Sequence, residues 1–383
     1  MKIAHIAPPW LAIPPKNYGG TEIVIYNLVE EQVARGHQVT LFAPGNTKTS
    51  AKLVSFFPKP LIEEGIPWHG HLKAYYHLHK SVEYVKQHKF DILHTHRFPF
   101  DRIQSWIGTA DELYMEWAPS LPMVAISESA REEVPYPLDF VGVVHHGLPM
   151  QQYIPTAKRR GDFFVWLGRF VADKGTHLAI EAAKRAGVKI VLAGTIDRHQ
   201  HESVGYFNDM IKPMIDNDQV KYVGPVNMKE KIRLLSRAQG FLNPIQWEEP
   251  FGMVMIEAMA LGCPVISFAR GAASEIVVHR KTGFLVQNVN EMVRFIPRID
   301  EIDREVVRQY VERNFSVRVM SEKYVKIYSQ VIKTAKCVPD RPYSNGTMGK
   351  SGKPQPTTSA IKKAGPAQVA APAKAEKEVN ARS

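Results

Sequence analysis

Short apolar runs alternate with segments of helical periodicity along most of the chain, which is the pattern of parallel α/β domains. Residues 2–6 form an apolar run that predicts a first strand. Residues 21–34 predict a helix, and four apolar side chains share its buried face: Ile25, Leu28, Val29 and Val33. Residues 39–43 form the next apolar run. The chain is therefore expected to open with a strand, a helix and a strand.

The same alternation predicts the remaining elements. Further strands are expected over residues 91–95, 124–127, 141–145, 163–167, 189–193, 220–223, 240–243 and 265–268. Helices are expected over residues 72–86, 128–133, 176–186, 228–237, 253–261, 289–296 and 303–312, with a last helix capped by Ser316. Residues 155–161 are polar and basic, which is typical of a linker. The pattern therefore predicts two successive domains.

The length of 383 residues is sufficient for two domains with sizeable cores. No apolar run approaches the ~18 residues that span a bilayer. Pro8 and Pro9 interrupt the first apolar run too soon for a signal peptide. Cys263 falls in a predicted core and Cys337 in a predicted tail, so no structural disulfide is expected. These features favour a reducing, cytoplasmic compartment.

The net charge of +11 lies mostly in the C-terminal tail. Residues 336–383 carry nine basic and three acidic side chains and almost no large apolar residue, so we expect them to be disordered. A basic surface favours nucleic acid or anionic lipid. The chain has no nucleic-acid-binding motif, so nucleic acid is not expected as a partner, whereas a peripheral membrane contact stays open.

One stretch, residues 244–268, carries the strongest chemical signal. Prolines and a glycine make its first third irregular, and the helix that follows is apolar nearly all round, which indicates burial. Glu257 interrupts that apolar surface and needs a basic partner or a polar ligand. Glu249 and the amides of Gly252 and Met253 follow a predicted strand, where parallel sheets bind ligands. The alternatives are a buried salt bridge for Glu257 and a solvated position for Glu249.

Two other loops also follow predicted strands. Gly19 and Gly20 precede the first helix and allow the backbone to approach a ligand at a helix N-terminus, where phosphate binds well. Arg169 and Lys174 follow the strand over residues 163–167. Two cations at that position would neutralise a diphosphate and stabilise it as it leaves. The alternatives are a flexible loop for the glycines and a solvated loop with a helix-capping lysine for the cations.

The segment EEPFGMVMIEAMALGCPVISF contains Glu249 and Glu257, and it resembles the Glu-x7-Glu motif of retaining, GT-B-fold glycosyltransferases of family 4. The segments APPW, YGGTE and GRFVADKG resemble other landmarks of that family. The resemblance implies an α/β protein of the GT-B fold, in which two Rossmann-like, doubly wound domains face each other across a cleft.

The implied domains follow the family's order. They are an N-terminal acceptor-side domain over residues 1–155, a nucleotide-sugar-binding domain over 156–315, a helix over 316–335 that crosses back to the first domain, and the tail over 336–383. The implied reaction moves a sugar from a nucleoside-diphosphate sugar to a glycan, lipid or small-molecule acceptor and retains the anomeric configuration. It requires no metal, no cofactor and no protein nucleophile, because the leaving phosphate deprotonates the acceptor.

The resemblance also assigns roles to individual residues. Arg169 and Lys174 would hold the diphosphate. Glu249 would contact the donor sugar, and Glu257 would accept hydrogen bonds from the ribose hydroxyls. Backbone contacts would come from Gly19, Gly20, Gly252 and Met253 beside the phosphates, and from Gly224 beside the base.

The chain departs from this family after the strand over residues 91–95. Relatives carry an extra strand that ends in Thr-x-His and places a histidine near the reacting sugar. Residues 97–123 contain no histidine, so we expect that strand to be deleted or replaced. His96 is the candidate substitute. The departure motivates one rival function, a non-catalytic GT-B protein that binds a nucleotide sugar or a partner. A UDP-sugar epimerase, which acts without an acceptor, is the other.

Metal chemistry has weaker support in the sequence. Asp216 and Asp218 fit the Asp-x-Asp pattern of metal-dependent GT-A transferases, but they lie in a polar turn. Histidine pairs one residue apart recur, and only His94 with His96 falls on a predicted strand, where both share a face. No cysteine or carboxylate completes that pair, so no metal site is expected. The chain also lacks a nucleophile elbow, a P-loop and a dinucleotide fingerprint, which disfavours hydrolases, P-loop NTPases and classical dehydrogenases.

Overall fold

The computed structural model describes residues 1–15, 19–66, 71–96, 122–134, 138–156, 161–198 and 200–337. All of them belong to one compact unit, Met1–Val338. Residues 97–121, where the family's extra strand is expected to be missing, lie outside the described residues. So does the tail beyond residue 337, and both predictions stay predictions.

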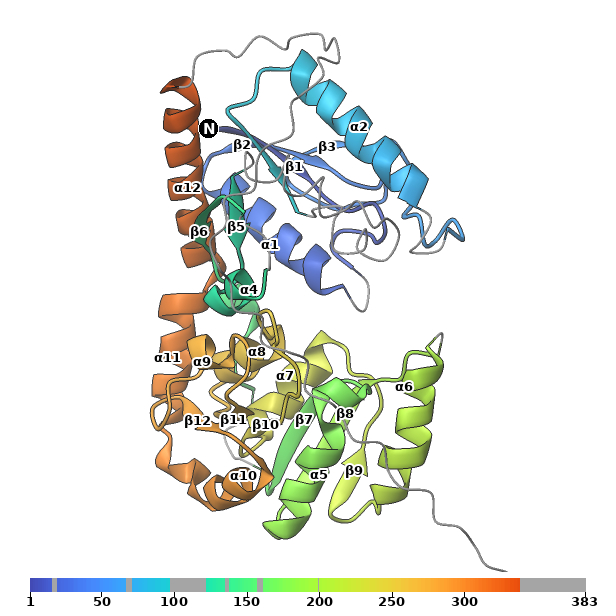
Figure 1. Cartoon of the computed structure of the whole chain (residues 1–383), viewed down its shortest axis with the longest axis vertical. Helices are drawn as coiled ribbons and strands as arrows, with labels where there is room; N and C mark the ends of the chain where they lie inside the picture. The colour runs from blue at the N-terminus through green and yellow to red at the C-terminus, as the bar shows by residue number, and fades with distance from the viewer. Residues whose placement is uncertain are drawn as a thin grey trace, which may run out of the picture. The chain divides into compact units, whose positions relative to one another are not determined.

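A four-stranded parallel sheet forms the N-terminal part of this unit, with the strand order β3-β2-β1-β4 (Figure 1). Its strands are β1 (Lys2–Ile6), β2 (Gln38–Phe42), β3 (Lys52–Val54) and β4 (Ile92–Thr95). The helices joined to them are α1 (Gly20–Ala34) and α2 (His71–Gln87). The predicted elements of this region are confirmed. Only β3 was not predicted, because a three-residue edge strand is too short to show a pattern.

A separate two-stranded parallel sheet consists of β5 (Met123–Ala125) and β6 (Phe140–Val143). Helix α4 (Glu128–Glu132) follows β5, and Ser127 caps it as predicted, because its hydroxyl accepts a 2.8 Å hydrogen bond from the Ala130 amide. Within the described ranges, neither strand pairs with β4. The described N-terminal sheet therefore ends at the strand after which the sequence departs from the family.

A six-stranded parallel sheet forms the C-terminal part, with the order β12-β11-β10-β7-β8-β9. Its strands are β7 (Phe163–Arg169), β8 (Lys189–Thr195), β9 (Val220–Tyr222), β10 (Phe241–Asn243), β11 (Val265–Phe268) and β12 (Gly283–Val286). The strand order runs outward in both directions from the neighbouring pair β7 and β10. In doubly wound sheets, ligands bind at this reversal point, past the carboxyl ends of the two strands.

The helices of the C-terminal part connect and cover these strands (Figure 1). They are α5 (Thr176–Arg185), α6 (His201–Gly205), α7 (Met228–Arg237), α8 (Met253–Ala260), α9 (Ala273–Ile276), α10 (Val289–Phe295) and α11 (Arg304–Phe315). Helix α8 lies in the core, since Met255, Ile256 and Met259 are fully buried and Glu257 is only 9% exposed. The prediction of a buried helix that carries one carboxylate is therefore confirmed.

Two glycines allow β7 and β8 to approach closely. The sequence predicts that the second of these strands ends at residue 193, but β8 continues to Thr195. Gly194 pairs with Gly168 across the two strands, and a Cβ at Gly194 would lie 1.9 Å from the Gly168 carbonyl oxygen. Gly194 therefore lies inside β8, at a close contact between two strands. In the sequence, such a glycine cannot be distinguished from one that ends a strand.

The last helix, α12 (Val317–Cys337), returns to the N-terminal sheet (Figure 1). Its predicted apolar stripe begins at Met320 and ends at Val331. These side chains pack in one cluster with Ile3 of β1 and Leu28 of α1. The stripe predicted from the sequence is thus buried against the first strand and helix of the chain.

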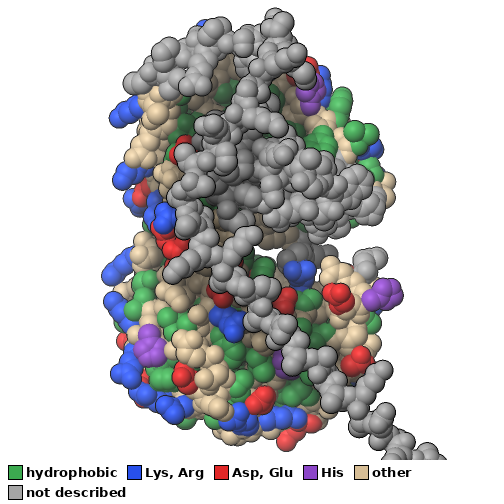
Figure 2. Space-filling view, viewed as in Figure 1, with side chains coloured by type: hydrophobic (Ala, Val, Ile, Leu, Met, Phe, Trp, Pro, Cys, Tyr) green, Lys and Arg blue, Asp and Glu red, His purple; other side chains and the backbone are tan. Residues whose placement is uncertain are grey.

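Among the described residues, no helix is long and apolar enough to cross a bilayer. On the face drawn in Figure 2, acidic and basic side chains are interspersed over the part that is coloured by type. The exposed part of that face therefore carries a mixed charge pattern.

Candidate active site

The carboxyl ends of both large sheets line one cleft of about 2050 Å³. Nine of the ten expected site residues lie on its wall: Gly19, Gly20, His96, Arg169, Lys174, Glu249, Gly252, Met253 and Glu257. Gly224 does not line the cleft, although its neighbour Pro225 does. The carbonyl of Gly224 accepts a 3.1 Å hydrogen bond from the Gly194 amide, so this turn is tied to the end of β8.

The two expected diphosphate cations lie at the carboxyl end of β7. Arg169 is the last residue of this strand, and Lys174 ends the short 3-10 turn Ala172–Lys174 that follows it. The Lys174 ammonium forms an ion pair with Glu249 and lies 5.1 Å from the centre of the Trp247 ring. The Trp247 indole N–H also donates to Glu249 at 3.1 Å. A lysine and a carboxylate predicted for different parts of a donor thus hold each other in this structure.

The loop after β7 packs directly on the loop after β10. Gly175 lies between them with a left-handed φ of 66°, and a Cβ there would lie 2.0 Å from the Pro244 carbonyl oxygen. The Gln246 amide donates a 2.8 Å hydrogen bond to the Asp173 carbonyl. This contact fixes the spacing between the basic loop and the Glu249 loop, at the reversal point of the sheet.

Glu257 has a basic partner, one of the two alternatives that the sequence leaves open. The Lys231 ammonium lies 2.5 Å from Oε1 of Glu257, and the Tyr153 hydroxyl donates to the same oxygen at 2.9 Å. Burial, and then the charge of Glu257, raise the pKa of Tyr153, so this hydroxyl stays protonated and serves as a donor. Both contacts use one carboxylate oxygen, while the side chain lines the cleft.

Two helices begin at the cleft with glycine. Gly19 precedes α1 and Gly252 precedes α8, and neither N-terminus receives a hydrogen bond from a side-chain cap at that residue. Gly252 has a φ of 90°, and a Cβ there would lie 2.5 Å from the Met255 side chain. The first amides of a helix carry partial positive charge. The wall of the cleft therefore carries two helix N-termini as well as Arg169 and Lys174.

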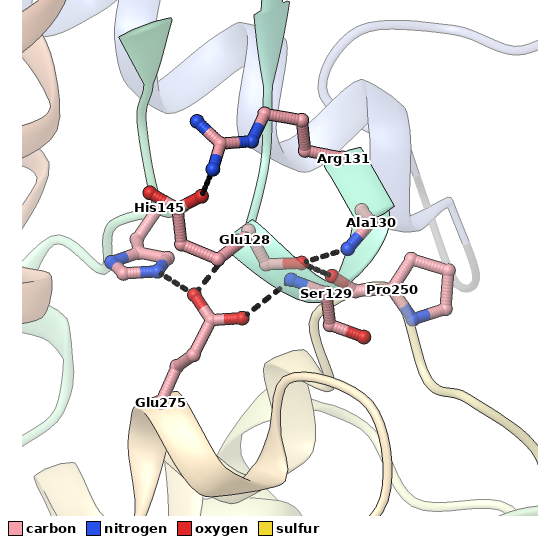
Figure 3. Close-up of polar contacts among 8 residues, drawn as sticks. Glu128, Ser129, Ala130, Arg131, His145, Pro250 and Glu275 are labelled. Carbon is pink, nitrogen blue, oxygen red and sulfur yellow. Dashed lines mark hydrogen bonds and ion pairs between the residues drawn. The ribbon is translucent and has the colours of Figure 1, made fainter. Parts of the chain in front are cut away.

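A polar cluster joins α4 to the C-terminal part beside the cleft (Figure 3). The Glu275 carboxylate in α9 accepts hydrogen bonds from the amides of Glu128 and Ser129, both at 2.9 Å, and lies 2.7 Å from Nε2 of His145. The Ser127 hydroxyl donates to the Pro250 carbonyl at 2.6 Å. One carboxylate thus holds the N-terminus of α4, while Ser127 reaches the loop that carries Glu249.

The Glu275 cluster predicts a pH-dependent stability difference. Burial raises the pKa of Glu275, but the Ser129 amide, His145 and the Glu128 amide together lower it below its usual value. The stabilisation is therefore full above the unfolded glutamate pKa of about 4.3 and is lost as the pH falls through the lower folded value. Glu275→Gln should melt below wild type at pH 7, and the difference should shrink below pH 4.3. An equal difference at pH 7 and pH 3.5 would contradict this role.

His96 lies on the cleft wall beside two other histidines. Its Nε2 lies 2.8 Å from Nδ1 of His5, and its ring stacks on His94 with centroids 4.1 Å apart. Burial lowers the pKa of His96 well below its usual value, and His94, His5 and His146 lower it further. The imidazole is therefore neutral at pH 7. Its role as the substitute for the family's histidine stays a prediction.

The Asp-x-Asp segment has a structural role. The carboxylate of Asp216 accepts hydrogen bonds from the amides of Asp218, Gln219 and Val220, and it lies 3.4 Å from the Lys184 ammonium. The Val220 amide makes the largest contribution to a pKa of about 2 for Asp216. This carboxylate closes the turn before β9 and does not line the cleft.

Several cleft residues were not predicted from the sequence. They are His5, Tyr153, Lys231 and Trp247, of which all but the buried His5 line the cleft. The argument for Glu257 requires a cation, and α7 leads directly into the central stretch, but the sequence does not distinguish Lys231 from the other basic residues of α7. His5 is on β1 in the same register as His94, which becomes visible once the two strands are known to be neighbours.

Two protein-family profiles match the chain. The family described as "Glycosyl transferases group 1" matches residues 154–313, and "Glycosyltransferase Family 4" matches residues 18–108. Together the matched segments cover about two thirds of the sequence. Among curated proteins, the putative glycosyltransferase YtcC of Bacillus subtilis is 25% identical over 240 residues, which span 54% of this chain and 58% of YtcC.

The fold is also similar to solved structures. Sucrose-phosphate synthase from Thermosynechococcus elongatus has a TM-score of 0.67 at 18% identity, and the match covers 87% of this chain and all of that one. HepE of Anabaena, in complex with UDP and glucose, has a TM-score of 0.62 at 16% identity, and the match covers 88% of this chain and 100% of HepE. Two doubly wound parallel sheets that line one cleft, together with these likenesses, define a protein of the GT-B fold, as the sequence predicts. The family matches support, within this class, a group 1 glycosyltransferase.

Proposed function

We propose that the protein transfers a sugar from a nucleoside-diphosphate sugar to an acceptor and retains the anomeric configuration. The observation that carries the proposal is the composition of one cleft. Arg169, Lys174, two helix N-termini and the buried carboxylate Glu257 all lie on its wall. Cations and helix ends suit a diphosphate, and a carboxylate suits the ribose hydroxyls.

Lys174 and Glu249 would act as a pair that the donor separates. In this structure the Lys174 ammonium neutralises Glu249, and both side chains are largely buried, at 23% and 14% exposure. A diphosphate carries more negative charge than one carboxylate, so it would draw Lys174 away from Glu249. The released carboxylate would then accept hydrogen bonds from the hydroxyls of the donor sugar. Binding of phosphate and recognition of the sugar would thereby be linked.

Glu257 would hold the ribose through its second oxygen. Lys231 and Tyr153 both contact Oε1, which fixes the orientation of the carboxylate group. We propose that Oε2 accepts the ribose hydroxyls, with the base beside the turn that contains Gly224. The Lys231 ammonium offsets part of the cost of burying this carboxylate in its apolar surroundings.

The protein would stabilise the negative charge that develops on the leaving diphosphate. Arg169, Lys174 and the amides at Gly20 and Met253 supply positive charge without a metal at the diphosphate. The leaving phosphate oxygen would take the proton of the acceptor hydroxyl as the new glycosidic bond forms on the same face. In this scheme no side chain attacks the sugar, and His96 contacts the reacting sugar as a neutral imidazole.

The test is turnover of UDP-, GDP- and ADP-sugars with and without a panel of glycan, lipid and small-molecule acceptors. We expect one nucleotide series to be consumed only when an acceptor is present, and proton NMR of the product to show the anomeric configuration of the donor. Glu249→Gln should lower turnover, and the exposed-residue variant Lys221→Ala should not. Inversion of the product would contradict the mechanism. Conversion of the free donor without an acceptor would indicate an epimerase.

A further inference from the structure

We propose that His5, His94 and His96 form a binding site for a divalent transition metal ion of the Zn²⁺ type. The site lies at the carboxyl ends of β1 and β4, on the wall of the cleft. It uses none of the residues assigned to the diphosphate or the ribose, and it shares only His96 with the transferase proposal, so metal binding is tested without turnover.

The sheet brings the three imidazoles to one point. His5 and His94 are register partners on the adjacent parallel strands β1 and β4. His96 comes two residues after His94, so its side chain shares the same face. One ring nitrogen from each histidine lies within 4.8 Å of the other two, and His5 Nδ1 is 2.8 Å from His96 Nε2. Tetrahedral Zn–N bonds of 2.0–2.1 Å separate ligand nitrogens by about 3.4 Å. Small ring rotations are therefore sufficient to form the site.

Neighbouring side chains orient two of the rings, as is usual around bound metal ions. Nε2 of His5 lies 2.7 Å from Oε1 of the buried Gln32 of α1. An amide oxygen accepts, so His5 carries its proton on Nε2 and presents the Nδ1 lone pair to His96. Nδ1 of His94 lies 2.6 Å from the Tyr328 hydroxyl of α12. These contacts come from helices α1 and α12, and they hold the two rings in place.

All three candidate ligands are imidazoles, which bind a metal ion through one ring nitrogen each. Three imidazoles without a carboxylate favour zinc, nickel or copper over magnesium or calcium.

The fourth coordination position would open to the cleft. His94 and His96 line the cleft, whereas His5 is fully buried behind them. Three protein ligands and one exchangeable position are the arrangement of zinc sites that act on small molecules, while structural sites are closed by four. The ion would therefore present a coordination position to ligands on the N-terminal side of the cleft.

The test uses the metal-free full chain. Zn²⁺ affinity is measured by competition with a chromophoric chelator, and Co²⁺ binding by its visible absorption, which is strong in tetrahedral sites. We expect the wild type to bind one equivalent of Zn²⁺ tightly and to show no comparable binding of Mg²⁺. In His94→Gln and in His96→Gln, the Zn²⁺ affinity should fall by about 100-fold or more. His79→Gln is the matched control, since His79 is 70% exposed on α2 and should leave the affinity unchanged.

Gln32→Leu separates a metal site from a purely structural cluster. It leaves all three ligands in place and removes the group that orients His5, so we expect the Zn²⁺ affinity to fall by about 10- to 100-fold while the far-UV circular dichroism is unchanged. Equal Zn²⁺ affinity in the wild type and in the His94→Gln/His96→Gln double variant would overturn the proposal. So would a Co²⁺ spectrum of octahedral intensity in the wild type.

Discussion

Glu257→Ala is expected to destabilise the protein by about 3 kcal/mol, because removal of one member of a buried ion pair leaves the other charge without compensation. Lys231 would remain only 18% exposed without its carboxylate, and Tyr153 would lose its acceptor. For a domain of about 150–250 residues, such as the one expected over residues 156–315, this loss corresponds to a fall in melting temperature of roughly 6–12 °C. Differential scanning calorimetry without ligand measures it directly.

Two further variants identify the cause of that effect. Removal of both charges in Glu257→Ala/Lys231→Met should restore part of the lost stability, since neither charge is then buried alone. Glu312→Ala, at an exposed position of α11, should change the melting temperature little. If Glu257→Ala melts like wild type, the contact between Lys231 and Glu257 contributes nothing to stability and the carboxylate serves the ligand alone.

Lys174→Ala is expected to lower kcat/KM for the nucleotide sugar by about 10²- to 10³-fold, which is typical of removing one group that stabilises transition-state charge. The variant loses a cation for the diphosphate and also the partner that holds Glu249 in place. Steady-state kinetics with the preferred donor measure the loss. Lys221→Ala, at an exposed position of β9 in the same sheet, is the matched control. A change below threefold in Lys174→Ala would exclude this lysine from the diphosphate site.

The separate residues of the cleft were more predictable than their pairings. Helix α8 could be predicted as buried, and an acidic residue on it requires a partner, so Glu257 could be identified from the sequence. Its partner Lys231 lies on a different helix, and nothing in the local pattern distinguishes it from neighbouring basic residues. Lys174 and Glu249 were each assigned to the donor, but their mutual contact depends on how the loops after β7 and β10 pack.

Contacts between distant strands explain the remaining differences. His5 is one of several polar residues near the N-terminus, and it meets His94 only because β1 and β4 are neighbours in the sheet. Glu275 lies in α9, and its hydrogen bonds to Glu128 and Ser129 join elements almost 150 residues apart. Local periodicity does not encode such contacts, because it describes one element at a time.

The most direct test of the donor site is a thermal-shift panel of UDP, GDP, ADP and their common sugars. It is run on the wild type, on Lys174→Ala and on Lys221→Ala. Ligand at about 100 times its Kd should stabilise the wild type by about 2.7 kcal/mol. We predict that one nucleotide series raises the melting temperature of the wild type and of Lys221→Ala, and that the shift is lost in Lys174→Ala. No shift with any nucleotide, or an equal shift in all three proteins, would contradict the proposed donor site.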